Sequence, residues 1–336
     1  MRLLLVKTSS MGDVLCAMPA LADAARALPQ LETDWVVEEG FADLPAMHRA
    51  VDRVIPVALR RWRRRPGEAL AELPAFLRAL RARRYDRILD SQGLLKSAGI
   101  ALAARGPAAG FDRRSAREPG AALAYRHRHA VPRERHAIER QRALFAAALG
   151  YGCPETPPEY GLLPPPPPLP QPYLVLAVET SWPSKRWPAA YWRQLIETAA
   201  GQGAAIYLPW LDEAQRERLR PLTAGLPTVR LHPTPDGKAL AALIGGARAL
   251  VAPDTGAAHL AAACGVPAIV LYGSTSPDRT GTAGPGQVHL RAAFACSPCF
   301  GRDCSYRGPA VVTPGCYGTL PPARVWAALQ PLLADR

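Results

Sequence analysis

The sequence predicts an α/β fold made of two doubly wound, Rossmann-like halves. Two observations favour this fold class. Short apolar segments alternate with helical patterns along nearly the whole chain, and a proline-rich segment interrupts the alternation near its middle. Strand–helix alternation is typical of a parallel sheet with helices on both faces. A chain of 336 residues is also long enough for two domains of roughly 150 residues each.

The periodicity of apolar residues places the elements. In the first half we expect strands at residues 2–7, 34–37, 53–56 and 86–90 and near residue 110. Helical patterns lie between them at residues 14–28, 41–49, 69–83, 96–104 and 136–149. The second half predicts strands at residues 173–178, 204–209, 228–231, 250–252 and 267–272. Its helices are expected at residues 189–200, 212–222, 238–244, 257–264 and 322–333.

Residues 164–172 read PPPPPLPQP, which favours an extended, semi-rigid spacer. The sequence therefore predicts an N-terminal domain at 1–163, a linker at 164–172, a second domain at 173–320 and a closing helix at 321–336. Two doubly wound halves are expected to bind a ligand in a cleft between them, at the carboxyl ends of the strands.

The composition is basic, with a formal net charge of +13, and arginine greatly outnumbers lysine. This charge points to an anionic partner: nucleic acid, an anionic membrane surface or a phosphorylated substrate. A biased genome is an alternative source of so many arginines. The longest apolar runs are too short for a membrane span, and a strand begins at once in place of a signal peptide. We therefore expect a cytoplasmic protein.

The loop from Thr8 to Asp13 follows the first predicted strand and leads into a helix. Loops of this kind commonly hold a phosphate on backbone N–H groups. Here the loop ends in a carboxylate, which would repel a phosphate. Asp13 is either a residue that caps the helix or a general base aimed at a substrate, and the loop alone leaves both possibilities open.

Two loops of the second half combine hydroxyl groups with charge. Thr180, Ser181 and Lys185 follow a strand and precede a helix, so they form either a diphosphate cradle or an ordinary polar loop. The segment from Asp254 to His259 reads DTGAAH, and its glycine and helix start favour an anion. The chain has no G-x-G-x-x-G or Walker motif, which argues against a dinucleotide dehydrogenase and a P-loop enzyme.

Several segments together resemble the heptosyltransferase I family within glycosyltransferase family 9, whose members build the lipopolysaccharide inner core. The resemblance rests on residues 6–15 (VKTSSMGDVL), 35–41 (WVVEEGF), 54–63 (VIPVALRRWR), 92–98 (QGLLKSA), 116–119 (AREP) and 185–188 (KRWP), and on the DTGAAH segment. It covers nearly the whole chain. The opening and the segments 35–41 and 54–63 favour type I over type II.

The resemblance implies a GT-B fold, with two Rossmann-like domains facing across a cleft and the last helix packing back on the first domain. The implied reaction moves L-glycero-D-manno-heptose from ADP-heptose to Kdo of Kdo2-lipid A with inversion. Asp13 would be the catalytic base. Donor-binding residues would be Thr180, Ser181, Lys185, Glu213, Asp254, Thr255, Gly256 and His259. Acceptor-binding residues would be Ser10, Gly12, Arg60, Arg61, Arg63, Arg64, Lys96 and Arg117. Neither a catalytic metal nor a cofactor is expected.

Residues 53–87 hold 11 arginines and three acidic residues. Arginine can hold the Kdo carboxylates and lipid A phosphates in a forked geometry, and a basic rim would steer a monomeric enzyme to the anionic inner-membrane surface. The alternative is that many of these arginines lie on solvent-exposed faces of helices and bind no partner. A nucleic-acid-binding protein would also be basic, but the arginine runs lack interleaved aromatic residues other than Trp62. A type II or other ADP-heptose transferase is the nearer alternative.

The chain departs from the family pattern at two places. Gln215 stands where the family carries a glutamate that contacts ribose, so we assign Glu213 to this role. The second departure is a segment with four cysteines, Cys296, Cys299, Cys304 and Cys316. Their spacing could hold a structural metal, although reduced thiols in a loop are the alternative we favour.

Overall fold

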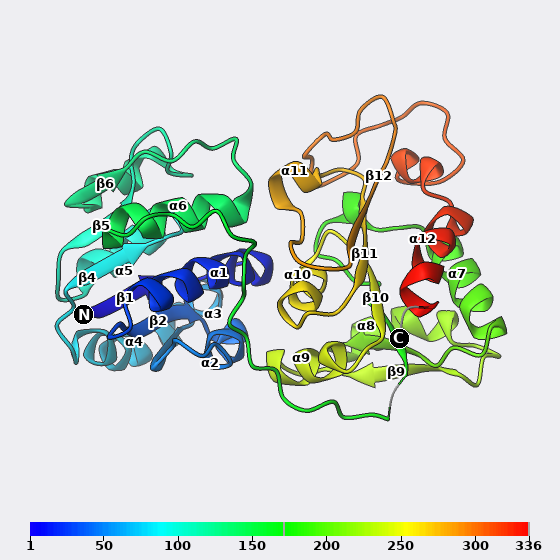
Figure 1. Cartoon of the computed structure of the whole chain (residues 1–336), viewed down its shortest axis with the longest axis horizontal. Helices are drawn as coiled ribbons and strands as arrows, with labels where there is room; N and C mark the ends of the chain where they lie inside the picture. The colour runs from blue at the N-terminus through cyan, green and yellow to red at the C-terminus, as the bar shows by residue number, and fades with distance from the viewer. Residues whose placement is uncertain (171, 335–336) are drawn as a thin grey trace. The chain divides into compact units, whose positions relative to one another are not determined.

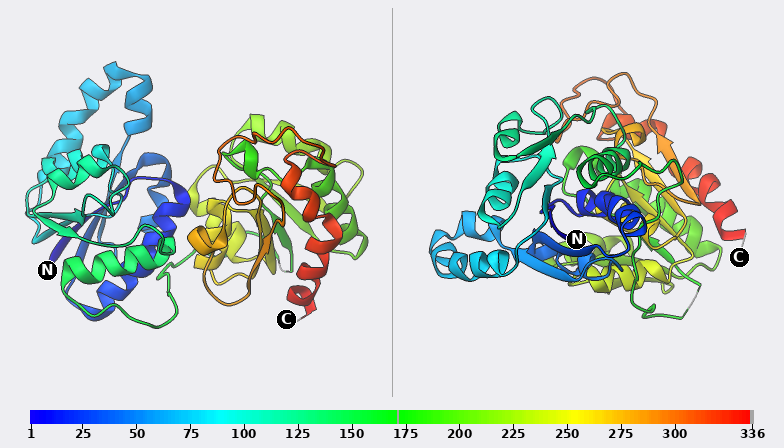
Figure 2. Two further views of the ribbon diagram at one scale, coloured as in Figure 1. Left: turned by 90° about the horizontal axis from the view of Figure 1, so that it is seen from above. Right: turned by 60° about the vertical axis from the view of Figure 1, so that its left-hand side comes forward.

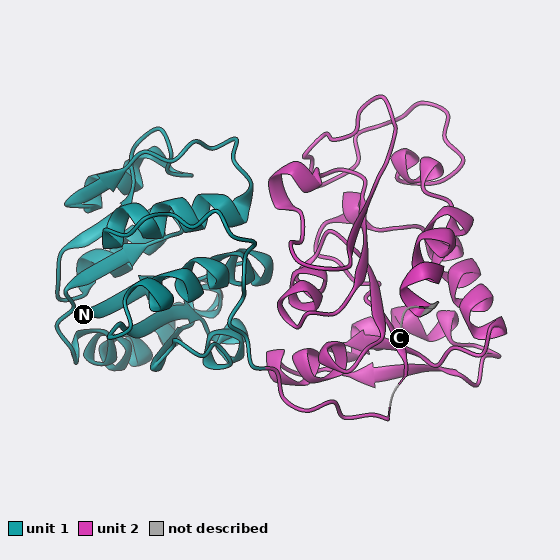
Figure 3. Ribbon diagram, viewed as in Figure 1, with its two compact units in different colours: residues 1–163 teal, residues 164–336 magenta. Residues whose placement is uncertain are grey.

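The computed structural model describes residues 1–170 and 172–334 and divides the chain into two compact units, residues 1–163 and 164–336 (Figure 3). Each unit is built around a six-stranded sheet in which every pair of neighbouring strands is parallel (Figure 1). The described residues contain no helix long and apolar enough to cross a membrane.

The sheet of the first unit has the strand order β3-β2-β1-β4-β5-β6. Its strands are β1 (Arg2–Val6), β2 (Glu32–Glu38), β3 (Arg53–Val57), β4 (Arg87–Asp90), β5 (Ala108–Phe111) and β6 (His127–His129). The periodicity predicts the first five. It misses β6, because this edge strand is only three residues long and all three are polar.

Helices cover both faces of this sheet. On one face lie α4 (Pro66–Arg81), α5 (Leu95–Ala103) and the 3₁₀ helix η2 (Pro119–Ala124), packed on Leu4 and Val6 of β1. Leu3 and Leu5 alternate with these residues and are buried on the other face, where α1 (Met11–Ala27) packs against α6 (Ala137–Leu149).

The segment between β2 and α4 differs from the prediction. The helix expected at 41–49 is instead a 3₁₀ turn, η1 (Glu39–Phe41), followed by the single turn α2 (Asp43–Ala46). An additional short helix, α3 (Leu59–Arg64), precedes α4. Four of its six residues are arginines, so the sequence shows no apolar periodicity there.

The sheet of the second unit has the order β12-β11-β10-β7-β8-β9, which is the same topology as in the first unit. Its strands are β7 (Leu174–Leu176), β8 (Ile206–Trp210), β9 (Val229–Pro233), β10 (Ala249–Pro253), β11 (Ala268–Tyr272) and β12 (Gln287–Arg291). The helices are α7 (Ala189–Gly201), α8 (Glu213–Leu219), α9 (Gly237–Gly245), α10 (Gly256–Ala263), α11 (Pro277–Thr280) and α12 (Pro322–Ala334). The short elements β12 and α11 are absent from the prediction.

The last helix belongs to the second unit. Helix α12 packs on α7, and its Val325 and Leu329 are buried in the core of that unit. We expected this helix to pack back on the first domain. Its apolar residues share a cluster with Trp192 and Leu195 of α7, so this side of the helix belongs to the core of the second unit. A contact with the first domain stays a prediction.

Each sheet has one point where the strand order reverses: between β1 and β4 in the first unit, and between β7 and β10 in the second. The loops after two such strands leave in opposite directions, so a space for a ligand forms outside their carboxyl ends. Ligand-binding residues are therefore expected in the loops after β1 and β4 and in the loops after β7 and β10.

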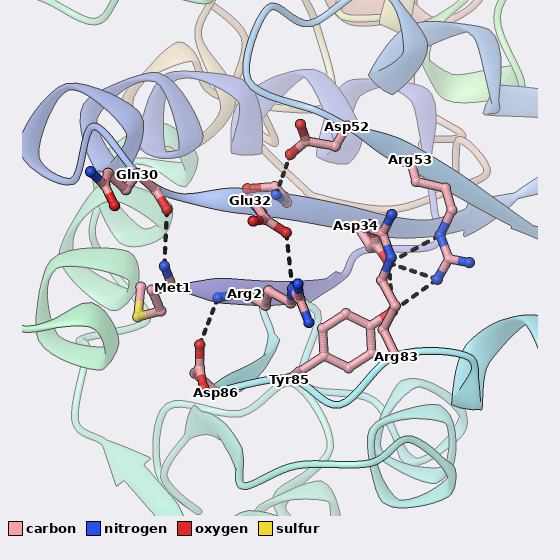
Figure 4. Close-up of polar contacts among 11 residues, drawn as sticks. Met1, Arg2, Gln30, Glu32, Asp34, Asp52, Arg53, Arg83, Tyr85 and Asp86 are labelled. Carbon is pink, nitrogen blue, oxygen red and sulfur yellow. Dashed lines mark hydrogen bonds and ion pairs between the residues drawn. The ribbon is translucent and has the colours of Figure 1, made fainter.

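Several arginines of the basic segment are structural. Asp34 of β2 is 2% exposed and accepts hydrogen bonds from Arg53, Arg83 and Tyr85, with a Tyr85 hydroxyl distance of 2.6 Å (Figure 4). Burial, and then the hydrogen bond to Asp34, raises the pKa of Tyr85 to about 12. These bonds join β2, β3 and the segment that enters β4, so Arg53 and Arg83 are committed to the fold.

The end of the first unit is held by a buried histidine. His48 forms a β-bridge with Leu162, its Nδ1 accepts the N–H of Ala50 at 3.1 Å, and its Nε2 lies 3.3 Å from the carbonyl of Met18. Burial lowers the pKa of His48 from 6.5 to about 4, although the Met18 carbonyl opposes the shift. The folded protein therefore holds His48 neutral.

This histidine predicts an acid-sensitive stability. Because the folded pKa lies below the unfolded one, the contribution of His48 is complete above pH 6.5 and is lost as the pH falls toward 4. We expect about 2 kcal/mol of the unfolding free energy to disappear between pH 7 and pH 5 on this account. Urea unfolding of wild type and His48→Asn, whose amide can still accept from Ala50, measures it. Equal pH slopes in the two proteins would contradict the assignment.

Candidate active site

Asp13 lies in the first turn of α1, at the switch point of the first sheet. Ser10 is the residue that caps the helix, and Asp13 Oδ2 accepts hydrogen bonds from the Ser10 N–H at 2.8 Å and the Ser10 hydroxyl at 3.0 Å. Among the described residues, the other oxygen of Asp13, Oδ1, has no hydrogen-bond partner. One oxygen thus stabilises the helix start while the other is free to accept a proton. The two roles left open by the sequence are compatible.

Gln92, in the loop after β4, clamps the loop that carries Asp13. Its Oε1 accepts the N–H and the hydroxyl of Thr8 at 2.7 and 2.8 Å, and its Nε2 donates to the carbonyl of Ser9 at 3.0 Å. Gln92 is itself buried. The sequence assigns no role to this residue, because a glutamine in a loop gives no signal of the partner 84 residues away.

A buried carboxylate holds Gln92 in turn. Asp90 ends β4, and its Oδ1 accepts the N–H of Gln92 at 2.9 Å, while its Oδ2 accepts the hydroxyl of Tyr125 at 2.7 Å. Burial raises the pKa of Asp90, and the hydrogen bond from Tyr125 opposes this shift. The position of the Asp13 loop is therefore fixed from the middle of the sheet.

Lys7 places a positive charge beneath the same loop. Its ammonium group is buried and donates to the carbonyl of Ser91 at 3.1 Å. Burial lowers the pKa of Lys7, and the charge of Asp13 is the strongest influence that opposes this shift. The Asp13 carboxylate therefore favours the charged form of Lys7.

The predicted acceptor residues Lys96 and Arg117 lie on adjoining segments. Lys96 is exposed at the start of α5, and Arg117 is exposed in the loop after β5. Glu118 joins the two segments, since its N–H donates to the carbonyl of Gly93 and its carboxylate accepts the N–H of Leu95. Gly93 has φ of +68°, a conformation suited to glycine, which allows the close approach of the Arg117 backbone.

The four arginines predicted from α3 do not share one environment. Arg60, Arg63 and Arg64 are exposed, and Arg60 lies over the ring of Phe41. Arg61 differs from our expectation. Its guanidinium donates to Glu39, Glu68 and Glu72 at 2.6 to 3.0 Å, and these hydrogen bonds raise its pKa. Arg61 therefore ties α3 to its neighbours and has no donor left for an anion.

The corresponding site of the second unit is centred on Asp254, which follows β10 and is 5% exposed. Lys185 Nζ donates to its carboxylate at 2.8 Å, and Thr275 donates to the same oxygen at 2.7 Å. Lys185 comes from the loop after β7, so the two loops of the second switch point meet through this ion pair. His259 is buried in α10 with Nε2 3.9 Å from Asp254 Oδ1.

Helix α10 begins at Gly256 with Thr255 as the capping residue. The Thr255 hydroxyl is buried and has no hydrogen-bond partner among the described residues. A buried unpaired hydroxyl costs free energy, so this oxygen is available to a bound ligand or a water molecule. Thr180 is half-buried and Ser181 exposed in the loop after β7, at the same edge of the sheet. Five residues predicted to bind the sugar donor therefore lie in the loops of one switch point: Thr180, Ser181, Lys185, Asp254 and Thr255.

Two further predictions have a different outcome. Glu213 begins α8, is exposed, and pairs with Arg216 at 2.8 Å, so its ribose contact stays a prediction. The four cysteines are free and line a single cavity of about 20 Å³ with Ser184 and Ser274. The described residues contain no group of three or more ligating side chains placed to hold a metal ion, so a structural metal is not supported there.

The comparisons with known proteins decide the family. The family model described as glycosyltransferase family 9 (heptosyltransferase) matches residues 74–309. The chain belongs to glycosyltransferase family 9. Lipopolysaccharide heptosyltransferase 1 of Pseudomonas aeruginosa is 46% identical over 99% of this chain and 98% of its own length.

Solved structures agree with this family 9 assignment. E. coli heptosyltransferase WaaC with ADP matches with a TM-score of 0.83 and 44% identity, over 87% of this chain and 93% of that one. The same enzyme with ADP-2-deoxy-2-fluoro heptose matches with a TM-score of 0.80, 43% identity and the same coverage. The predicted GT-B fold class and glycosyltransferase activity are confirmed, and the nucleic-acid-binding alternative loses its support.

The Gln92 clamp predicts a positioning effect on glycosyl transfer. Gln92→Leu removes the bonds that hold residues 8 and 9, so Asp13 should be misplaced and kcat should fall roughly 10²-fold, with KM for the sugar donor unchanged. Gln141→Leu is the matched control, because Gln141 is equally buried but bonds the Ser91 carbonyl and not the loop. Steady-state kinetics and melting curves measure both variants. Equal losses of kcat in the two would show that Gln92 acts through stability alone.

Proposed function

We propose that this family 9 enzyme transfers L-glycero-D-manno-heptose from ADP-heptose to a Kdo hydroxyl of Kdo2-lipid A, with inversion at the anomeric carbon. The single observation that carries the proposal is the Asp13 carboxylate, held at a switch point with Oδ1 free. An inverting transfer needs one base on the acceptor side of the sugar and no second carboxylate.

The bond changes follow from this arrangement. The acceptor hydroxyl gives its proton to Asp13 Oδ1 as its oxygen forms a bond to the anomeric carbon. The bond from that carbon to the β-phosphate oxygen breaks, and ADP leaves with the electron pair. Negative charge therefore develops on the β-phosphate, where oriented N–H and hydroxyl donors stabilise it most.

The donor side is supported by Lys185, Thr255 and the N-terminus of α10. The unpaired Thr255 hydroxyl and the N–H groups at Gly256 suit a phosphate oxygen. Lys185 is a compact charge suited to phosphate, and its ion pair with Asp254 holds it at this site. The WaaC structures with ADP and with an ADP-heptose analogue support the same donor class for this chain.

The acceptor side is supported by exposed cations that have no acidic partner. Arg63 and Arg64 of α3, with Lys96 and Arg117, make no ion pair with another described residue. Kdo carboxylates and lipid A phosphates are the anions that such a set would hold. An acceptor of this kind resides in the inner membrane, so we place the enzyme in the cytoplasm as a monomer at that membrane's surface.

The decisive variant is Asp13→Asn. The amide oxygen can still accept the Ser10 N–H, so the helix start should persist, but the base is lost and kcat should fall by about 10²- to 10⁴-fold. Transfer from ADP-heptose to Kdo2-lipid A and ADP-heptose affinity measure the two effects, and affinity should change little. Asp43→Asn is the control, because Asp43 also lies in the first turn of a helix. Near-wild-type transfer by Asp13→Asn would show that Asp13 only caps α1.

A second measurement separates the acceptor arginines from the structural one. Arg63→Ser with Arg64→Ser should raise KM for Kdo2-lipid A about tenfold, because two exposed cations lose their contact with the acceptor anions. The melting temperature should not change. Arg61→Gln should instead lower the melting temperature, since Arg61 holds three glutamates. Better transfer to a heptosylated acceptor than to Kdo2-lipid A would overturn the type I assignment.

A further inference from the structure

The solvent-facing side of α4 is apolar over its first turns. Leu70 is 80% exposed and Leu73 is 40% exposed, and their exposed neighbours are Ala71, Pro74 and Ala75. We call these five residues the apolar α4 face. A helix on the surface of a protein usually carries polar residues on its outer side, and here the inner side is also apolar, with Phe76 and Leu80 in the core.

The one acidic residue in this stretch does not interrupt the face. Glu72 turns toward α3, where it accepts hydrogen bonds from Arg61 and from the indole N–H of Trp62. The pair of helices α3 and α4 projects from the sheet of the first unit in both views of Figure 2, where they are the light-blue helices. The five residues of the face are therefore exposed on a projecting pair of helices.

Arginines border the apolar α4 face at both ends. Arg63 and Arg64 precede α4, and Arg78 lies one turn beyond Ala75; all three are exposed and none pairs with an acidic group among the described residues. Helix α5 is packed beside α4 on the same face of the sheet, and its first residue, Leu95, is 60% exposed. The adjoining Lys96 is a further exposed cation.

We propose that the apolar α4 face inserts into the interfacial region of an anionic lipid bilayer, with the bordering arginines on the phosphate headgroups. Apolar side chains bounded by arginine are the pattern of interfacial helices, and cations near such a surface add to the binding. A second copy of the chain fits less well, because a two-fold contact through this face would bring its unpaired arginines together. The face serves a lipid-linked acceptor only if the proposed function holds, but its binding is measured independently.

Vesicle co-sedimentation of the full chain tests the proposal. Wild type should partition to vesicles of phosphatidylcholine with phosphatidylglycerol, and less to phosphatidylcholine alone. Leu70→Ser with Leu73→Ser should weaken partitioning about tenfold or more, because two leucine side chains lose their burial in the bilayer. Leu102→Ser is the matched control, since Leu102 is 65% exposed on α5 but lies outside the face. Its partitioning should equal that of wild type.

Three results would overturn the proposal: unchanged partitioning of the double variant, equal binding of wild type to neutral and anionic vesicles, or a dimer in sedimentation velocity that the double variant abolishes. Melting curves and transfer to a de-acylated, water-soluble Kdo acceptor show that the double variant is folded, and both should match wild type. If wild type fails to transfer heptose to either acceptor, the proposed function fails while the vesicle result still stands or falls alone.

Discussion

The reversal of strand order in each sheet is the constraint on which the two sites depend. In the first unit it forces the loops after β1 and β4 apart, and in the second it does the same for the loops after β7 and β10. In each unit one side chain then links the two loops. Gln92 bonds residues 8 and 9, and Lys185 pairs with Asp254. Both sites therefore owe their geometry to contacts made across a switch point.

The basic charge of the chain divides into two kinds of arginine. Arg53 and Arg83 meet a buried aspartate, and Arg61 meets three glutamates, so these cations are neutralised within the fold. Arg63 and Arg64 are neighbours of Arg61 in the sequence, yet they have no acidic partner among the described residues. Net charge alone cannot distinguish the two kinds, because the acidic partners come from other elements of the chain.

Features that depend on local sequence are predictable, whereas those that depend on distant partners are not. The strands around Leu4, Val251 and Ile269 are buried on both faces, so their unbroken apolar runs identify them. Asp13, Lys185 and Thr255 follow such strands, and their place at the carboxyl edge is predictable from the alternation. The Gln92 clamp and the engagement of Arg61 are not, since each depends on partners distant in the sequence. The packing of the final helix on α7 is equally hidden, because its apolar residues do not identify their partner.

The two units use one architecture for opposite electrostatic purposes. A helix begins at each switch point, and its N-terminus attracts negative charge. In α1 that charge is supplied from within, because the Asp13 carboxylate accepts the Ser10 N–H and would repel an external anion. In α10 no carboxylate occupies the first turn, and the Thr255 hydroxyl stays unpaired among the described residues. In the proposed reaction, the first helix thus offers a carboxylate for the acceptor proton, whereas the N-terminus of the second suits a phosphate. In the proposed reaction, the two units therefore divide proton acceptance and leaving-group stabilisation between them, the two tasks that an inverting glycosyl transfer requires.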